Sequence, residues 1–166
     1  MANKSRTVAF LGLCTALAMI LAYIEAVLPP IFSAVPGIKM GLPNIIIIFL
    51  LYRKGPSFAI LVSLLRIALI STLFGNAMAF FYSIAGGILS LLVMILLSKL
   101  RFLSTVGVSV AGGVAHNVGQ ILMAMLLLET TELAYYLAVL IVTGTISGAL
   151  IGLCGAMLVK KVPKNI

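Results

Sequence analysis

The stretch FAILVSLLRIALISTLF, residues 58–74, decides the class of this protein because it places one guanidinium inside an otherwise apolar run. With its flanks, the run is long enough for a membrane-spanning helix, which needs about 20 apolar residues. Arg66 lies near its middle, and an arginine side chain keeps its charge at any accessible pH. Estimates of the free energy needed to place such a charge at mid-membrane run from about 2.5 to more than 10 kcal/mol. We therefore expect the chain to use this charge.

The composition of the whole chain also indicates an integral membrane protein. Of its 166 residues, 63% are hydrophobic and only 8% are charged, whereas soluble domains are roughly a quarter charged. A chain of this length has room for one compact helical bundle and none for an additional soluble catalytic domain. We expect a single transmembrane domain over residues 1–166.

Six apolar runs predict an all-α, polytopic bundle of six transmembrane helices. The runs lie at about 7–28, 42–52, 56–75, 77–98, 103–128 and 133–159. The second run is short and opens with Pro43 and Asn44, so we expect it to be tilted or preceded by a re-entrant segment. The preceding stretch PPIFSAVPGIKMGLPN, residues 29–44, is rich in proline, which forbids continued helix. We expect it to fold over the outer mouth of the bundle, with a plain interfacial loop as the alternative.

The positions of the basic residues indicate a membrane topology rather than a nucleic-acid partner, although the net charge is +8. Nine of them stand at the chain ends or between apolar runs: Lys4, Arg6, Arg53, Lys54, Lys99, Arg101, Lys160, Lys161 and Lys164. By the positive-inside rule, both termini are then cytoplasmic. We expect the plasma membrane of a prokaryotic cell and contacts with its lipids. Cys14 and Cys154 have neither the spacing of a metal site nor that of a disulfide framework.

The strongly polar residues predicted at membrane depth fall almost entirely in the outer half, if depth is counted at about 1.5 Å per helical residue. The candidate substrate contacts are Glu25, Lys39, Asn44, Arg66, Asn76, Tyr82, His116, Asn117 and Gln120. A pore or proton path would place polar groups across the full thickness. The asymmetry therefore favours a binding pocket that is open to the outside only.

The charges near this predicted pocket favour an anionic solute. Two cations, Lys39 and Arg66, face one nearby acid, Glu25, and arginine binds carboxylates and phosphates through paired hydrogen bonds. Aromatic residues at the same level would stack on a ring, line an isoprenoid tail, or simply form an interfacial belt. The alternative for Arg66 is a structural ion pair with Glu25.

Small residues at four-residue spacing mark two helices as close-packing surfaces. The first run carries Ala18, Ala22 and Ala26, and the last run carries Gly144 and Gly148 with further small residues. Small residues let helix backbones approach closely in a membrane. Packing within the bundle explains both series, and docking of a partner subunit is the alternative for the alanines.

The size, topology and alanine pattern TALAMILAYIEA of residues 15–26 resemble the S components of energy-coupling factor (ECF) transporters. Those subunits capture a vitamin or another scarce nutrient. The resemblance implies that Ala18, Ala22 and less clearly Ala26 dock onto a transmembrane T component, which is driven by two cytoplasmic ATPase subunits. Any ATP would then be hydrolysed by these partners, because nothing in the chain resembles a P-loop.

A more specific resemblance rests on ALAMILAYIEAVLPP, PGIKMGLPNI and LLRI, which begin at residues 16, 36 and 64. These stretches resemble the Gx transporter family, which is also labelled heptaprenyl diphosphate synthase component I and is regarded as S-component-like. The family label implies a link to prenyl diphosphates. Prenyl diphosphate synthases bind magnesium through aspartate-rich motifs, however, and this chain contains no aspartate. We therefore expect no enzyme activity, no cofactor and no metal bound by this chain.

The sequence thus predicts a substrate-capture subunit of an ATP-driven uptake system for a small anionic nutrient, a cofactor precursor or an isoprenoid- or quinone-related molecule. Three alternatives stay open. The first is a non-catalytic membrane component linked to heptaprenyl diphosphate synthesis, the second is an assembly subunit of a membrane redox complex, and the third is a stand-alone secondary transporter.

Overall fold

The computed structural model describes residues 2–27, 41–74 and 77–163, and nearly all of these are helical. The helices are α1 (Ala2–Val27), α2 (Asn44–Arg53), α3 (Pro56–Phe74), α4 (Ala77–Ser98), α5 (Thr105–Leu127), the short 3₁₀-helix η1 (Glu132–Tyr136) and α6 (Leu137–Lys161). The all-α prediction is confirmed. The bounds agree with the apolar runs to within a few residues, except that α1 begins earlier than expected.

Five of these helices are long and apolar enough to cross a membrane, and α2 is not. At about 1.5 Å per residue, the ten residues of α2 cover about half of a hydrocarbon core that is about 30 Å thick. Among the described residues, five helices are therefore long enough to span and one is half-length, so the expected sixth crossing is not confirmed. Apolar composition identified the segment, but helix length decides whether it spans.

Local sequence explains where two of the short connections fall. Gly55 adopts a left-handed φ of +96° and donates its N–H to the carbonyl of Leu50, which ends α2. Pro56 follows directly as the first residue of α3, where its missing N–H costs nothing. Before α5, the Ser104 hydroxyl accepts a hydrogen bond from the N–H of Gly107, which is a typical N-cap.

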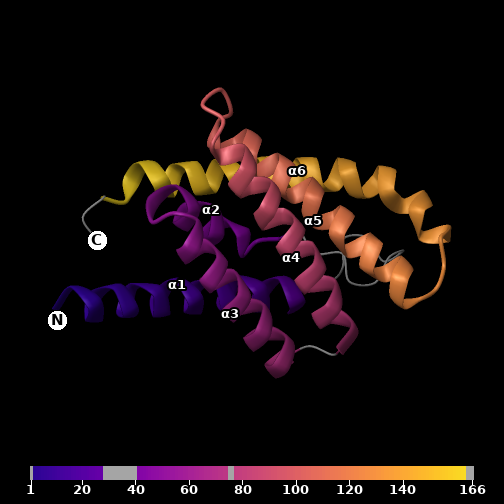
Figure 1. The fold of residues 1–166 in the computed structure, drawn as a ribbon, viewed down its shortest axis with the longest axis horizontal. Coiled ribbons are helices and arrows are strands. Elements are labelled where there is room, and N and C mark those ends of the chain that lie inside the picture. Colours follow the sequence, from indigo (N-terminus) through magenta and orange to yellow (C-terminus); the bar gives the residue numbers. More distant parts are fainter. Residues whose placement is uncertain (1, 28–40, 75–76, 164–166) are drawn as a thin grey trace.

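The helices alternate in direction, so that the basic residues gather at one end of the bundle. The start of α1, the connection from α2 to α3 and the end of α6 lie at the same side in Figure 1. The basic residues there and in the connection from α4 to α5 are Lys4, Arg6, Arg53, Lys54, Lys99, Arg101, Lys160 and Lys161. Arg53 donates hydrogen bonds to the carbonyls of Val159 and Val162, and thereby holds the end of α2 against the end of α6.

Helix α2 forms the centre of the bundle at this basic end. Six consecutive residues, Ile46 to Leu51, are buried on all sides of the helix, and α2 contacts α1, α3, α4 and α6. A helix that is apolar all round must be enclosed by its neighbours or by lipid. Because α2 is short, it fills only the basic half of the interior, and side chains of the longer helices line the other half.

Glycines bring α4, α5 and α6 into close contact. Gly144 and Gly148 of α6 lie against the backbone of α5, and Gly119 of α5 lies against the backbone of α4 at Ala85 and Gly86. Packing between helices of this chain therefore accounts for the glycine series of α6. Close backbone approach of this kind is the usual way in which membrane helices associate.

The contact between α5 and α6 leads to a first prediction. A Cβ atom at Gly148 would lie 2.7 Å from the Cα of Val110 and 2.8 Å from the carbonyl oxygen of Ser109. These are backbone atoms that cannot rotate away, so Gly148→Ala should force the two helices apart and destabilise the fold by about 1–3 kcal/mol. The expected result is a lower temperature at which detergent-solubilised protein loses its monodisperse gel-filtration peak.

The matched control for this substitution is Gly12→Ala on α1, because nothing lies within 4 Å of a Cβ at Gly12. This variant should lose its monodisperse peak at the same temperature as the wild type (the thermal midpoint) or at a slightly higher one, since alanine is the better helix former. Equal midpoints for the two variants would contradict the close packing of α5 on α6.

Candidate functional site

A polar pocket lies in the half of the bundle away from the basic end, beyond the first residue of α2. It is lined by Ala22, Glu25, Gly41, Arg66, Ile67, Ile70, Ser71, Ser83 and His116, which come from α1, α3, α4, α5 and the residues before α2. Its volume is about 390 Å³ with the open mouth counted. The enclosed part is much smaller, with room for little more than a water-sized group. The pocket therefore suits the head of a ligand rather than a whole large molecule.

Arg66 is the main charged group of this pocket. Its side chain extends from α3 and is only 9% exposed. Within the described part of the chain, no group accepts a hydrogen bond from its Nε, which is fully buried. A buried guanidinium nitrogen without a hydrogen-bond acceptor is costly. The binding role of Arg66 stays a prediction.

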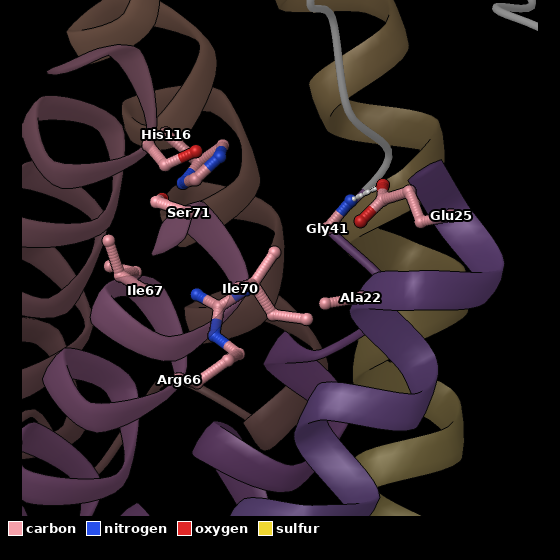
Figure 2. Close-up of a pocket in the computed structure, with 9 residues that line it drawn as sticks. Ala22, Glu25, Gly41, Arg66, Ile67, Ile70, Ser71 and His116 are labelled. Carbon is pink, nitrogen blue, oxygen red and sulfur yellow. Dashed lines mark hydrogen bonds between the residues drawn. The ribbon is translucent and has the colours of Figure 1, made fainter. Parts of the chain in front are cut away.

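Glu25 lies across the pocket from Arg66 and holds the chain before α2 in place. One carboxylate oxygen accepts a hydrogen bond from the backbone N–H of Gly41, and Gly41 has a left-handed φ of +83° that favours glycine. Figure 2 shows Glu25, Gly41 and Ala22 on one side of the pocket and Arg66, Ser71 and His116 on the other. Glu25 interacts with Arg66 through space, but the two side chains form no contact ion pair.

His116 and Gln120 of α5 are four residues apart and therefore share one helix face, which lies against α4 at Gly86. A Cβ atom at Gly86 would meet the side chains of both residues. Only His116 lines the pocket. Gln120 is buried between the helices, and its Nε2 has no hydrogen-bond partner among the described residues.

Asn117 points away from the pocket, although it neighbours His116 in the sequence. Its Nδ2 donates a hydrogen bond of 2.9 Å to the carbonyl oxygen of Leu140 in α6, and the side chain is buried. It therefore links α5 to α6. The residue lies about 100° around the helix from His116, so it reaches a different neighbour.

The other predicted contacts are divided between the rim of the pocket and the undescribed segments. Asn44 begins α2 and its side chain lies against Gly41, next to the pocket but not among its lining residues. Tyr82 is half-buried on α4 and also lies outside the lining. Lys39 and Asn76 lie outside the described residues, so their roles stay predictions.

The alanines predicted for partner docking differ in exposure. Ala18 is fully buried and Ala22 is 8% exposed, whereas Ala26 is exposed. Because α1 packs mainly on α3, Ala18 and Ala22 face the bundle, and Ala22 also lines the pocket. Their docking role stays a prediction, and in this structure only Ala26 is open to a partner.

Comparison with known families gives one match, which covers most of the chain. Residues 14–158 match the family described as heptaprenyl diphosphate synthase component I. The chain belongs to this family. No curated protein and no solved structure matches it. The predicted likeness of its fold to ECF S components therefore stays a prediction.

Membership in the heptaprenyl diphosphate synthase component I family supports the isoprenoid link among the predictions. The description names one component of a synthase, which implies a partner subunit. Several apolar helices indicate a membrane-spanning protein. The T component and the ATPase subunits have no such support.

Sequence reasoning missed three polar or backbone elements of the pocket in this family member: Gly41, Ser71 and Ser83. Serine is common in membrane helices, so neither serine stood out as a contact. The four- to five-residue spacing of Ile70 and Ser71 from Arg66 would have placed both near the same face of α3. Gly41 could not be found from the sequence, because its N–H bond to Glu25 is a tertiary contact.

Two arginines lead to a second prediction, because half-buried Arg53 donates from Nη2 to two backbone carbonyls, whereas the buried Nε of Arg66 has no hydrogen-bond partner among the described residues. Arg53→Gln should lower stability by about 1.5–3 kcal/mol, the range for hydrogen bonds to charged groups. Arg66→Gln should leave stability unchanged or raise it, since a desolvated charge is removed and its buried Nε has no hydrogen-bond partner among the described residues. Thermal midpoints of both variants in lipid nanodiscs check this.

A loss of stability in Arg66→Gln as large as that in Arg53→Gln would contradict this interpretation. Arg66 would then be a structural partner of Glu25 rather than a binding residue. Glu25→Gln, measured beside them, should weaken the bond to the N–H of Gly41 and lower the midpoint modestly.

Proposed function

We propose that this chain is a non-catalytic, membrane-embedded component that works with a prenyl diphosphate synthase and binds an amphipathic, isoprenoid- or quinone-related molecule. Its pocket takes the anionic head of that molecule at Arg66. The observation that carries the proposal is a nine-tenths buried arginine whose Nε has no hydrogen-bond partner among the described residues and whose side chain points into a polar pocket. The family match supports the isoprenoid link.

The distribution of acidic residues supports a non-catalytic role. The chain has three of them, Glu25, Glu129 and Glu132, and no aspartate. Glu129 and Glu132 are exposed at the connection from α5 to α6, and neither lines the pocket. No group of three potential metal ligands is found among the described residues. Magnesium-dependent prenyl transfer needs clustered carboxylates, so we assign the chemistry to a partner subunit.

The lining of the pocket supports an amphipathic rather than a fully polar ligand. The apolar residues Ile67, Ile70 and Ala22 line the pocket beside the charged groups. An apolar segment next to the head of the ligand therefore loses little free energy when it enters the pocket. An amphipathic molecule dissolves in the bilayer and reaches the pocket from the lipid. The apolar helix α2 closes the other half of the bundle, and the ligand is therefore held rather than passed through.

The third prediction tests the proposed binding directly. Native mass spectrometry of the protein, purified from the membrane in mild detergent, should show a retained amphipathic molecule on the wild type and on Arg101→Gln. Arg66→Gln should lose it. Arg101 is exposed at the basic end, so the control removes the same charge away from the pocket.

The same preparation distinguishes a catalytic role from a non-catalytic binding role. Mixed with isopentenyl diphosphate and an allylic diphosphate, the chain alone should form no product. It should associate with the catalytic component of the synthase. Chain elongation by this protein alone would contradict the proposal, and so would an identical retained molecule in Arg66→Gln.

A second candidate function is substrate capture for an ATP-driven uptake system with a T component and two ATPase subunits. It is favoured by the position of the pocket in the half of the bundle opposite the basic residues. By the positive-inside rule that half faces outward. A solute from outside would then enter at Arg66, and α2 would block the way inward. The family match favours the first function over this one.

The fourth prediction concerns the orientation that uptake requires. In a variant with Cys14 and Cys154 replaced by serine, Thr130→Cys should react with a membrane-impermeant maleimide in intact cells. Phe102→Cys, at the basic end and 81% exposed, should react only after the cells are opened. The opposite pattern would place the pocket half inside the cell and eliminate the uptake function.

A further inference from the structure

We propose that the basic end of the bundle binds the head group of an anionic phospholipid, in a cluster of cations around the end of α2. The cluster comprises Lys4 and Arg6 of α1, Lys54 directly after α2, and Lys160 and Lys161 of α6. The juxtaposition that carries the inference is the meeting of three segments that lie far apart in the sequence, each of them basic. The inference concerns the end of the bundle away from the pocket and does not depend on the ligand proposed there.

The end of α2 is joined to the end of α6 by hydrogen bonds. Arg53, the last residue of α2, donates from Nη2 to the carbonyl oxygens of Val159 and Val162. Lys160 and Lys161 lie between these two acceptors in the sequence, and both are exposed. Their backbone is therefore held beside the last turn of α2.

The residue that follows α2 connects the cluster to α1. The Nζ of Lys54 lies 5.2 Å from the centroid of the Phe10 ring, and the Phe10 ring also contacts Phe49 of α2. Arg6 precedes Phe10 by four residues, so the two share one face of α1. Figure 1 shows the end of α2 between α1 and α6, which form the two sides of the cluster.

The acidic residues of the chain all lie toward the other end of the bundle. Glu25 stands in the last turn of α1, while Glu129 and Glu132 belong to the connection from α5 to α6. Because α1 begins and α6 ends at the basic end, none of these carboxylates offsets the cluster directly. Like charges that are held together repel, and an anion from outside the chain would relieve this repulsion.

Membrane topology explains why each of these segments is basic, but it does not explain why three of them meet. The positive-inside rule concerns the number of Lys and Arg residues in the connections and sets no contact between them. Lys99 and Arg101, in the connection from α4 to α5, obey the same rule outside the cluster. In Figure 1 that connection projects from the bundle at the top, away from the start of α1 and the end of α6.

The depth of the cluster favours a phospholipid over a soluble partner. The 25 residues of α6 extend roughly 37 Å, somewhat more than a hydrocarbon core of about 30 Å, so its last turn reaches the level of the lipid head groups. Along α1, the exposed apolar residues Val8 and Leu13 follow the cations toward the centre of the membrane. Acyl chains follow the head group of a phospholipid in the same order. Basic clusters at the inner ends of membrane helices are typical sites for anionic lipid head groups.

The test titrates the full chain, delipidated in detergent, with phosphatidylglycerol or with phosphatidylcholine of the same acyl chains. Native mass spectrometry measures the dissociation constant of the first bound lipid. The wild type should bind phosphatidylglycerol about tenfold or more tightly, as expected when two or more cations lie near one lipid charge. Added ammonium acetate should reduce this preference, because salt screens exposed charges.

The decisive variant combines Arg6→Gln with Lys160→Gln and so removes one exposed cation from each side of the cluster. It should lose most of the preference for phosphatidylglycerol. The matched control combines Lys99→Gln with Arg101→Gln, which removes the same charge at the same end but outside the cluster, and it should keep the preference. All four residues are exposed, so both variants should retain the wild-type thermal midpoint in detergent.

Three outcomes would overturn the inference. Equal dissociation constants of the wild type for the two lipids would show that the cluster does not recognise an anionic head group. An equal loss of preference in the control pair would assign the attraction to the whole basic end rather than to this cluster. If polyglutamate, added as a competitor, binds more tightly than phosphatidylglycerol and depends on Arg6 and Lys160, the cluster is a docking surface for an acidic protein instead.

Discussion

The short central helix α2 determines how the interior of this bundle is divided. Its buried residues Ile46 to Leu51 fill the core at the basic end, but a ten-residue helix reaches only about half-way across a bilayer. The longer helices continue past its first residue. The remaining space must be filled by their side chains, and there a guanidinium and a carboxylate meet hydroxyl groups and an imidazole. The pocket is a consequence of this mismatch in length.

Close packing between the other helices stabilises this arrangement, in which α2 fills one half of the interior and the pocket lies in the other. The glycine contacts bring α4, α5 and α6 together, and Asn117 adds a hydrogen bond from α5 to α6. Arg53 ties the end of α2 to the end of α6. Among the described residues, the buried Nε of Arg66 has no hydrogen-bond partner. The contacts that hold the bundle together therefore do not use this nitrogen, in keeping with the binding role proposed for Arg66.

The family match and the pocket bear on different parts of the function. Membership in the heptaprenyl diphosphate synthase component I family links the chain to isoprenoid chemistry and to a partner subunit. The pocket brings Arg66 and Glu25 to facing sides of one cavity. The proposed membrane component, which binds an isoprenoid-related molecule and leaves catalysis to its partner, draws on both observations.

The sequence by itself determined the helices, the gathering of basic residues at one end and the place of Arg66 within an apolar helix, because hydropathy and charge act along the chain. It also placed Glu25 and His116 near Arg66, since helix rise gives depth. Only the tertiary structure decided which residues share the pocket. Asn117 turns to α6, while Ser71, Ser83 and Gly41 enter the lining. The depth of a residue in the membrane follows from its position along one helix. The direction in which its side chain points depends on how that helix is rotated against its neighbours, and only packing fixes that rotation.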